Sequence, residues 1–345
     1  MTIATGIVAV LGIALLMVVH EGGHHLVARA FGMKVLKFSI GMGPPIWRHQ
    51  PKDSDTVYQV ALIPFMAYVQ IHGMNPLEEV DPDDKESYAN ASLIARISAI
   101  FAGPLANYLF ASVLFFGALV IGGQQTPSLT VAEVSKESPA LAAGIQAGDR
   151  IVRIEGAQLN GWDDLVTRVQ ASPDREIEVV VMREGAERSI RVTPKKNPAG
   201  KGLIGVSPTF ERSDIALGEA TERALILPAK MVVEMLKGIG RIITGKEKAE
   251  LGGPIRIFEE SSKAAKAGAD QYLGLLGVLS TWLAVFNLLP IPALDGGRLM
   301  FLGYEAITRR RANAKVEATV HLVGFALLFM LLLVVSVGDV GRFFD

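Results

Sequence analysis

Four apolar segments of this chain are each long enough to cross a lipid bilayer. They run from about Ile3 to Phe31, from Leu93 to Ile121, from Tyr272 to about Ile291, and from Val320 to Val337. A helix needs roughly 20 residues to cross about 30 Å of hydrocarbon. Half of the 345 residues are hydrophobic, which is too apolar for an ordinary soluble protein of this length. The sequence therefore predicts a polytopic α-helical membrane protein with four transmembrane helices and room for a soluble domain.

The first apolar segment could instead be a cleaved signal peptide, because Ala28-Arg29-Ala30 resembles a small-residue cleavage site. However, no positive charge precedes the segment, and its apolar run is too long for a signal core. We therefore interpret it as the first membrane span.

Lysine and arginine residues cluster in the two short connections between spans. They are Arg29, Lys34, Lys37, Arg48, Lys52 and Arg96 in the first connection, and Arg298, Arg309, Arg310, Arg311 and Lys315 in the second. Positive residues mark the cytoplasmic side of a membrane protein. Both short connections should therefore be cytoplasmic, and both chain ends and the long middle region should lie outside.

The first span contains the charged motif His20-Glu21-Gly22-Gly23-His24. Residues four apart share one face of a helix, so the two histidines can bind one zinc ion while Glu21 projects beside it as a general base. Ionisable side chains in an apolar span need a functional reason, and metal coordination supplies one. His20 lies about 13 Å along the helix from Arg29, whose side chain can reach the cytoplasmic interface. The predicted zinc site is thus inside the membrane, nearer its cytoplasmic face.

Two histidines leave a catalytic zinc ion one protein ligand short. The other histidines are poor candidates: His25 points away from the shared face, His49 lies among loop residues, and His72 and His321 stand alone. We expect His25 to contact a neighbouring helix or a carbonyl group, and His49 to be solvated.

Asp295 is the better candidate for the third ligand. It belongs to Asn287-Leu288-Leu289-Pro290-Ile291-Pro292-Ala293-Leu294-Asp295-Gly296-Gly297, which closes the third span near the same cytoplasmic level. The prolines break the helix and the glycine pair permits close backbone approach. Broken helix at membrane depth is tolerated only where it faces protein or a watery cavity. The alternative is a loop aspartate that caps the next helix.

The pairing of H-E-G-G-H with N-L-L-P-I-P-A-L-D-G-G resembles the site-2 protease family of intramembrane zinc metalloproteases, and most closely its bacterial regulator-of-sigma-E proteases. Further matching motifs are Phe38-Ser39-Ile40-Gly41-Met42-Gly43-Pro44, Ala102-Gly103-Pro104-Leu105-Ala106-Asn107 and Leu251-Gly252-Gly253-Pro254-Ile255. The resemblance implies that His20, His24 and Asp295 bind one zinc ion per chain. It also implies that Glu21 is the catalytic base and that Asn287 hydrogen-bonds the scissile peptide.

The same resemblance implies an activity and a location. The expected protein is an endopeptidase of the bacterial cytoplasmic (inner) membrane, with both termini and the middle domain on the periplasmic side. It would cut single-pass transmembrane segments within the bilayer, as the second cut of regulated intramembrane proteolysis after another protease has acted. Anti-sigma factors and remnant signal peptides are the implied substrates.

Other classes of function are disfavoured. A catalytically silent membrane scaffold or chaperone would not need the intact Glu21, and a metal transporter is disfavoured because the spans carry no inverted repeat. The net charge of −1 offers no basic field for nucleic acid. The absence of cysteine excludes disulfides, thiolate zinc ligands and cysteine nucleophiles.

The stretch from Ser138 to Gly156 resembles the core of a bacterial PDZ domain. The expected elements are strands Arg150–Ile154, Glu176–Met182 and Arg188–Val192 and a helix Asp163–Val169. PDZ domains bind extended peptides or free C-termini at a sheet edge. The stretch Gly202, Leu203, Ile204 and Gly205 resembles their carboxylate-binding loop, moved to the end of the domain by permutation. The alternative is a closed module that binds nothing. Enterobacterial relatives carry two tandem PDZ domains, whereas this chain has room for one.

The connection between the first two spans resembles the membrane-associated β-hairpin of the family, over Thr56 to Gly73. We expect its edge around Val69 to pair with a locally unwound substrate as an added strand. The alternative is a rigid loop that plugs the cavity.

The expected organisation is a membrane domain in two parts, residues 1–121 and 271–345, around a PDZ domain at 127–208 and an amphipathic helical region at 209–270. Within that region, Ser213 to Ile243 should lie on the outer membrane surface or against the PDZ domain. Glu259 to Ala269 should form a further short surface helix.

Overall fold

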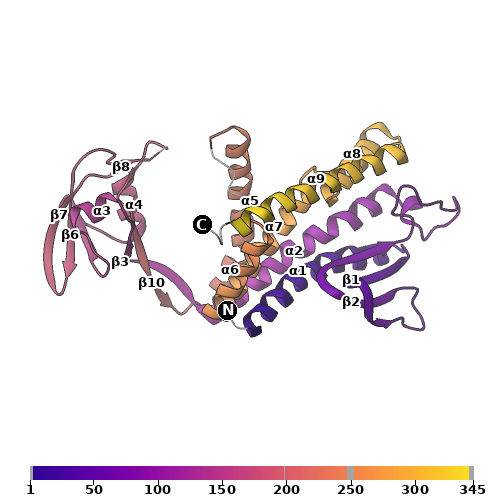
Figure 1. The fold of residues 1–345 in the computed structure, drawn as a ribbon, viewed down its shortest axis with the longest axis horizontal. Helices are drawn as coiled ribbons and strands as arrows, with labels where there is room; N and C mark the ends of the chain where they lie inside the picture. Colours follow the sequence, from indigo (N-terminus) through magenta and orange to yellow (C-terminus); the bar gives the residue numbers. More distant parts are fainter. Residues whose placement is uncertain (1–2, 198, 247–251, 342–345) are drawn as a thin grey trace. The chain divides into compact units, whose positions relative to one another are not determined.

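The computed structural model describes residues 3–197, 199–246 and 252–341 (Figure 1). The chain forms two compact units, residues 1–121 with 216–345 and residues 122–215. We refer to them as the membrane unit and the inserted unit. Leu251, the first residue of the L-G-G-P-I motif, lies outside the described residues, as do the ends of the predicted membrane domain.

Four helices of the described chain are long and apolar enough to cross a membrane, by length and composition. They are α1 (Ile3–Ala30), α2 (Leu93–Gly122), α7 (Ala269–Leu288) and α9 (Ala314–Gly341). The last two helices differ most from the predicted spans, since α7 also begins before Tyr272 and α9 also ends after Val337. Helix α7 ends earlier because Leu289, which precedes Pro290, is extended. Helix α9 begins earlier because the Asn313 side chain accepts the Lys315 N–H and so starts a polar first turn.

The described part of the membrane unit also contains the helices α5 (Leu217–Ile243), α6 (Pro254–Ala267) and α8 (Asp295–Thr308), and a short 3-10 helix, η1 (Tyr88–Asn90). Helix α5 begins later than predicted, because residues up to Ser213 belong to a strand. Its buried Ala224 contacts Ala111 and Phe115 of α2. Part of α5 therefore packs on the membrane unit itself, which the sequence did not predict.

Helix α6 is capped from a distant part of the sequence. Its N-cap residue is Gly253, which offers no side chain. The buried Asp339 carboxylate of α9 accepts the N–H groups of Gly253 and Arg256, at 3.2 and 3.3 Å. A Cβ at Gly253 would lie 2.3 Å from this carboxylate, so the glycine makes room for the cap. The cap ties α6 to the last predicted span.

Strands β1 (Val35–His49) and β2 (Val57–Ile71) occupy the connection between α1 and α2. Residues 37–40 of β1 pair with residues 57–60 on one side and with residues 67–70 on the other. The predicted hairpin is therefore incomplete: its two arms do not pair with each other, because β1 lies between them. The outer segments are 45–49 and 67–71, and the latter lies against α1.

The described residues of the inserted unit form an α+β domain. Its elements are β3 (Gln124–Val134), α3 (Pro139–Ala143), β4 (Arg150–Ile154), β5 (Ala157–Gln158), α4 (Trp162–Gln170), β6 (Ile177–Arg183), β7 (Ala186–Val192), β8 (Lys195–Lys196), β9 (Gly202–Leu203) and β10 (Val206–Ser213). The main sheet has the strand order β10-β3-β4-β6-β7, with the short β5 beside β4, and β8 and β9 form a separate pair. The core gathers residues of all the long strands and both helices, among them Val131, Ile151, Leu165 and Val179. The order places β10 at the sheet edge, and Gln124 pairs with Ser213, so the unit begins and ends at one place.

Candidate metal centre

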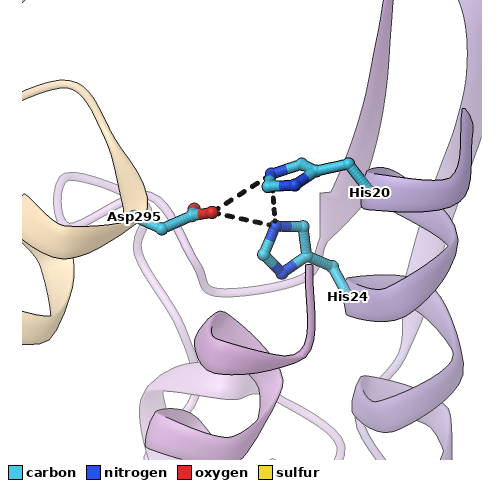
Figure 2. A group of neighbouring side chains, drawn as sticks. All are labelled: His20, His24 and Asp295. Carbon is cyan, nitrogen blue, oxygen red and sulfur yellow. Dashed lines mark hydrogen bonds and ion pairs between the residues drawn. The ribbon is translucent and has the colours of Figure 1, made fainter. Parts of the chain in front are cut away.

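His20, His24 and Asp295 converge on one point, as Figure 2 shows. The His20 and His24 Nε2 atoms lie 3.3 Å apart. Asp295 Oδ2 lies 3.1 Å from the first and 3.3 Å from the second. Both histidines are about 95% buried, with 5% and 4% of their surfaces exposed. Imidazole nitrogens and a carboxylate oxygen that converge in a buried place form a usual set of metal ligands.

The distances fit a zinc ion. Zinc bonds of about 2.0–2.2 Å at tetrahedral angles separate neighbouring ligand atoms by about 3.3 Å. Asp295 Oδ2 is buried and has no hydrogen-bond donor, although it faces both imidazoles. Imidazole and carboxylate groups are usual zinc ligands, and three of them leave the fourth position open for water or substrate. The residues can therefore hold a catalytic zinc ion.

The loop between α7 and α8 delivers Asp295 to the histidines. A Cβ at Gly296 would lie 2.0 Å from the Leu289 carbonyl oxygen, and one at Gly297 would lie 2.6 Å from that of Ile291. The glycine pair thus permits the predicted close backbone approach. Asp295 is the first residue of α8 and its side chain does not cap the helix. The helix N-terminus nearby favours its negative charge.

Glu21, on α1, follows His20 directly in the chain. Its Oε2 accepts the backbone N–H of Val69, 2.9 Å away on β2. This N–H belongs to the outer segment 67–71 and points away from β1. The structure therefore brings the predicted base and the predicted substrate-binding strand into direct contact.

Helix α2 supports both histidines. The Ala99 carbonyl lies 2.8 Å from His24 Nδ1, and the Asn107 amide lies 3.3 Å from His20 Nδ1. A Cβ at Gly103, between them, would lie 2.3 Å from the His24 ring. Asn107 ends the motif A-G-P-L-A-N, for which the sequence predicted no role in the site. The signal that could have identified it is a polar side chain in an apolar span.

The remaining residues that were predicted to bind substrate are Asn287 and four residues of the inserted unit. Asn287 donates from Nδ2 to the Leu283 carbonyl of its own helix, at 3.0 Å. In the inserted unit, Gly202 and Leu203 form β9, Ile204 is in the core, and Gly205 has a φ of +80°. These four residues lead directly into the edge strand β10.

The other histidines lie outside the site. His25 hydrogen-bonds the Tyr58 hydroxyl of β2 at 3.2 Å, so its partner is a strand and not the expected helix or carbonyl group. His72 lies within 2.9 Å of Glu78 and Asp84 carboxylates, and His321 accepts the Ala293 N–H at 2.9 Å. His49 ends β1 with its ring stacked on Trp47, so it is not a loop residue.

Comparison with known proteins gives matches along nearly the whole chain. The sequence pattern of peptidase family M50 matches residues 8–331. A protein of Clostridium acetobutylicum, provisionally named a zinc metalloprotease, is 32% identical over 97% of this chain and 96% of its own length. The zinc metalloprotease RasP of Geobacillus kaustophilus is 29% identical over 94% of this chain and 95% of its own.

Among solved structures, the PDZ domain of an SdrC-like protein from Listeria monocytogenes matches with a TM-score of 0.22 and 16% identity. It covers 24% of this chain and 88% of that structure.

Proposed function

The chain belongs to peptidase family M50 and is a zinc metalloprotease, and from this premise we propose that it cuts single-pass transmembrane segments within the bilayer. The observation that carries the proposal is the group formed by His20, His24, Asp295 and Glu21. Two of these ligands and the base lie inside α1, a helix long and apolar enough to cross a membrane. A water-activating site at this depth suits a peptide bond that is itself in the membrane.

We propose that His20, His24 and Asp295 hold the zinc ion and that Glu21 is the general base. A bound zinc ion supplies a Lewis acid and lowers the pKa of water toward 7. Glu21 takes the proton of the attacking water and passes it to the leaving amine. Its contact with the Val69 N–H holds the carboxylate beside the site until substrate arrives.

A transmembrane substrate must unwind before its backbone can be attacked, because a helix hides its peptide groups in internal hydrogen bonds. We propose that the unwound stretch pairs with the outer segment 67–71. This segment has β1 on one side only, and its Val69 N–H already points at Glu21. An added strand would therefore lie next to the base. The Asn287 amide, with one N–H bond still free, would bind the substrate from the other side.

In the inserted unit, we propose a peptide-binding groove along β10. The proposed carboxylate-binding loop is the stretch that precedes this edge strand, Gly202, Leu203, Ile204 and Gly205. Helix α4 lies against this loop, since Gly202 approaches the Val169 carbonyl. An extended peptide or a free C-terminus is the ligand that such an edge takes.

The proposed location is the bacterial cytoplasmic membrane, with both termini and the inserted unit on the periplasmic side. Arg29 in the last turn of α1 and Arg96 at the start of α2 support this orientation, because positive residues stay cytoplasmic. The proposed substrates are anti-sigma factors or remnant signal peptides, each already trimmed by another protease.

The test uses the full chain purified in detergent with a panel of tagged single-pass segments. We expect cleavage by the wild type, and loss of cleavage on addition of a zinc chelator. Glu21→Gln should retain one zinc ion per chain and lose cleavage, because only the base is removed. Asp295→Ala should lose the zinc ion itself, as measured by metal analysis of the purified protein.

Three outcomes would count against the proposal. Cleavage by Glu21→Gln at the wild-type rate would remove Glu21 from the mechanism. A full zinc content in Asp295→Ala would mean that the metal lies elsewhere. Failure of the wild type on every segment, with zinc present, would leave the metal site standing and reject membrane segments as substrates.

A further inference from the structure

We propose that Asn107 is a positioning residue that accepts a hydrogen bond from His20 Nδ1–H and so fixes the imidazole for zinc. This inference rests on His20 being a zinc ligand, as proposed above. Nothing in the motif that contains Asn107 assigns it this role; the evidence is its place on α2.

The first observation is that Asn107 is fully buried and only partly satisfied. Its exposed fraction is 0%. Its amide nitrogen lies 3.3 Å from His20 Nδ1, while its Oδ1 has no hydrogen-bond partner. An unpaired buried acceptor is destabilising, so an amide oxygen without a donor calls for an explanation.

The second observation concerns the histidine. His20 turns Nε2 toward His24 and Asp295, which leaves Nδ1 for Asn107. When a metal binds Nε2, Nδ1 of the neutral ring carries the hydrogen and must donate it. Rotating the amide by about 180° places Oδ1 against that hydrogen. The buried acceptor and the donor that zinc binding creates then satisfy each other.

The third observation is that His24 is already held in this way. Its Nδ1 lies 2.8 Å from the Ala99 carbonyl, while its Nε2 faces the metal position. Ala99 and Asn107 lie two turns apart on α2, opposite two histidines one turn apart on α1. Metal-binding histidines usually donate their second nitrogen to a carbonyl or carboxylate. Helix α2 thus supplies one acceptor to each histidine, a backbone carbonyl to one and a side chain to the other.

Two substitutions test whether the Asn107 side chain acts as a hydrogen-bond acceptor, as a donor or only as a packing group. Asn107→Leu keeps the branched shape, with two somewhat larger methyl groups, and removes both polar atoms. Asn107→Asp keeps the shape and the acceptor and removes the amide donor. The matched control is Ser280→Ala: the Ser280 hydroxyl donates to the Asn107 backbone carbonyl at 2.8 Å, so its loss disturbs the α2–α7 contact but not the amide.

The experiment measures the zinc affinity of the full chain in detergent by competition with a chromogenic chelator. The absorption bands of Co²⁺ bound in place of zinc give a second readout. We expect Asn107→Leu to bind zinc about 10- to 100-fold more weakly, with altered cobalt bands. Asn107→Asp should bind within a few-fold of wild type, and Ser280→Ala should match the wild type.

Wild-type affinity in Asn107→Leu would overturn the inference. So would an equal loss in Asn107→Asp and Asn107→Leu, because a role as donor or as packing group would affect both. If Asn107→Leu does not fold, the aspartate variant alone decides between acceptor and donor. A His20→Ala variant that keeps its zinc would instead reject the proposed ligand set, so the two failures are distinguishable.

Discussion

Gly22 and Gly23 are neighbours in the metal-binding motif but have opposite surroundings. A Cβ at Gly23 would lie 2.3 Å from the Ala102 carbonyl oxygen of α2, whereas one at Gly22 would meet nothing within 4 Å. We expect Gly23→Ala to push α1 from α2, cost about 1–3 kcal/mol and lower the zinc content. Gly22→Ala should keep the α1–α2 contact and the zinc content, because the added methyl group meets no neighbour and alanine favours a helix over glycine by up to about 1 kcal/mol.

Metal analysis and thermal unfolding of the two variants check this prediction. The variants differ only in which of two adjacent glycines gains a methyl group, so each is the other's control. Equal zinc content and equal stability in both would show that the close contact of α1 with α2 does not support the site.

Asp149 gives the inserted unit a predictable response to acid. Its carboxylate is buried and takes two hydrogen bonds from the Arg183 guanidinium, at 2.6 and 2.7 Å. This pairing, helped by the Gln146 N–H, holds the pKa of Asp149 below its ordinary value. The stability it contributes is therefore fully present above about pH 4 and is lost as the pH falls through the lowered pKa.

Asp149→Asn should lack that acid-dependent loss and should be about 2 kcal/mol less stable at pH 7, where the charged pair is intact in the wild type. Hydrogen exchange of β4 and β6 amides in the full chain, at several pH values between 3 and 7, measures both effects. A wild-type and a variant protein with parallel pH profiles would remove Asp149 as the cause.

At the level of single residues, the sequence predicted the groups that a motif or a broken helix marks and missed a partner that only the packing of two helices reveals. His20, Glu21 and His24 could be placed together because helical spacing alone decides which residues share a face. Asp295 was predicted from the broken helix around it, and the structure brings it to the histidines. Asn107 received no role because its partner lies on another helix, and spacing along one segment cannot reveal the register between two.

Among the elements, strand β1 was the least predictable. Gly41 and Gly43 adopt positive φ, +89° and +91°, and prolines follow at 44 and 45. These residues read as a turn, yet a Cβ at Gly41 would lie 2.7 Å from the Ile63 carbonyl, so the glycine permits a close pairing. The expected hairpin therefore omitted the strand that lies between its arms. The apolar spans, by contrast, were predicted to within a few residues because their length alone identifies them.

The outer segment 67–71 carries the prediction at this scale. Val69→Pro removes the N–H that contacts Glu21 and blocks strand addition at this edge. We expect cleavage to be lost while one zinc ion per chain is retained. Val69→Ala, which keeps the N–H, is the control and should cleave at a rate close to that of the wild type. Activity in the proline variant would show that substrate does not pair here.

For the whole molecule, the inserted unit is joined to the rest at one place. Gln124 and Ser213 are paired on neighbouring strands, and Gly123 approaches the Ser213 carbonyl. Paired residues lie about 5 Å apart, so a short Gly-Ser linker can replace residues 124–213. We expect the shortened chain to keep its zinc ion, because every proposed ligand belongs to the membrane unit.

Metal analysis of the shortened chain, together with cleavage of a short membrane segment, tests this independence. Loss of zinc would mean that the membrane unit needs the inserted unit to fold. Retained zinc with altered cleavage would assign the inserted unit to the handling of substrate.

The wide sequence separation of the proposed metal-binding side chains has a consequence for the synthesis of the protein. His20 and His24 leave the ribosome long before Asp295. Chains fold progressively as they are made, so a nascent chain that stops before Asp295 holds only two of the three proposed ligands. The order of residues along the chain therefore delays the complete ligand set until the loop between α7 and α8 has been made.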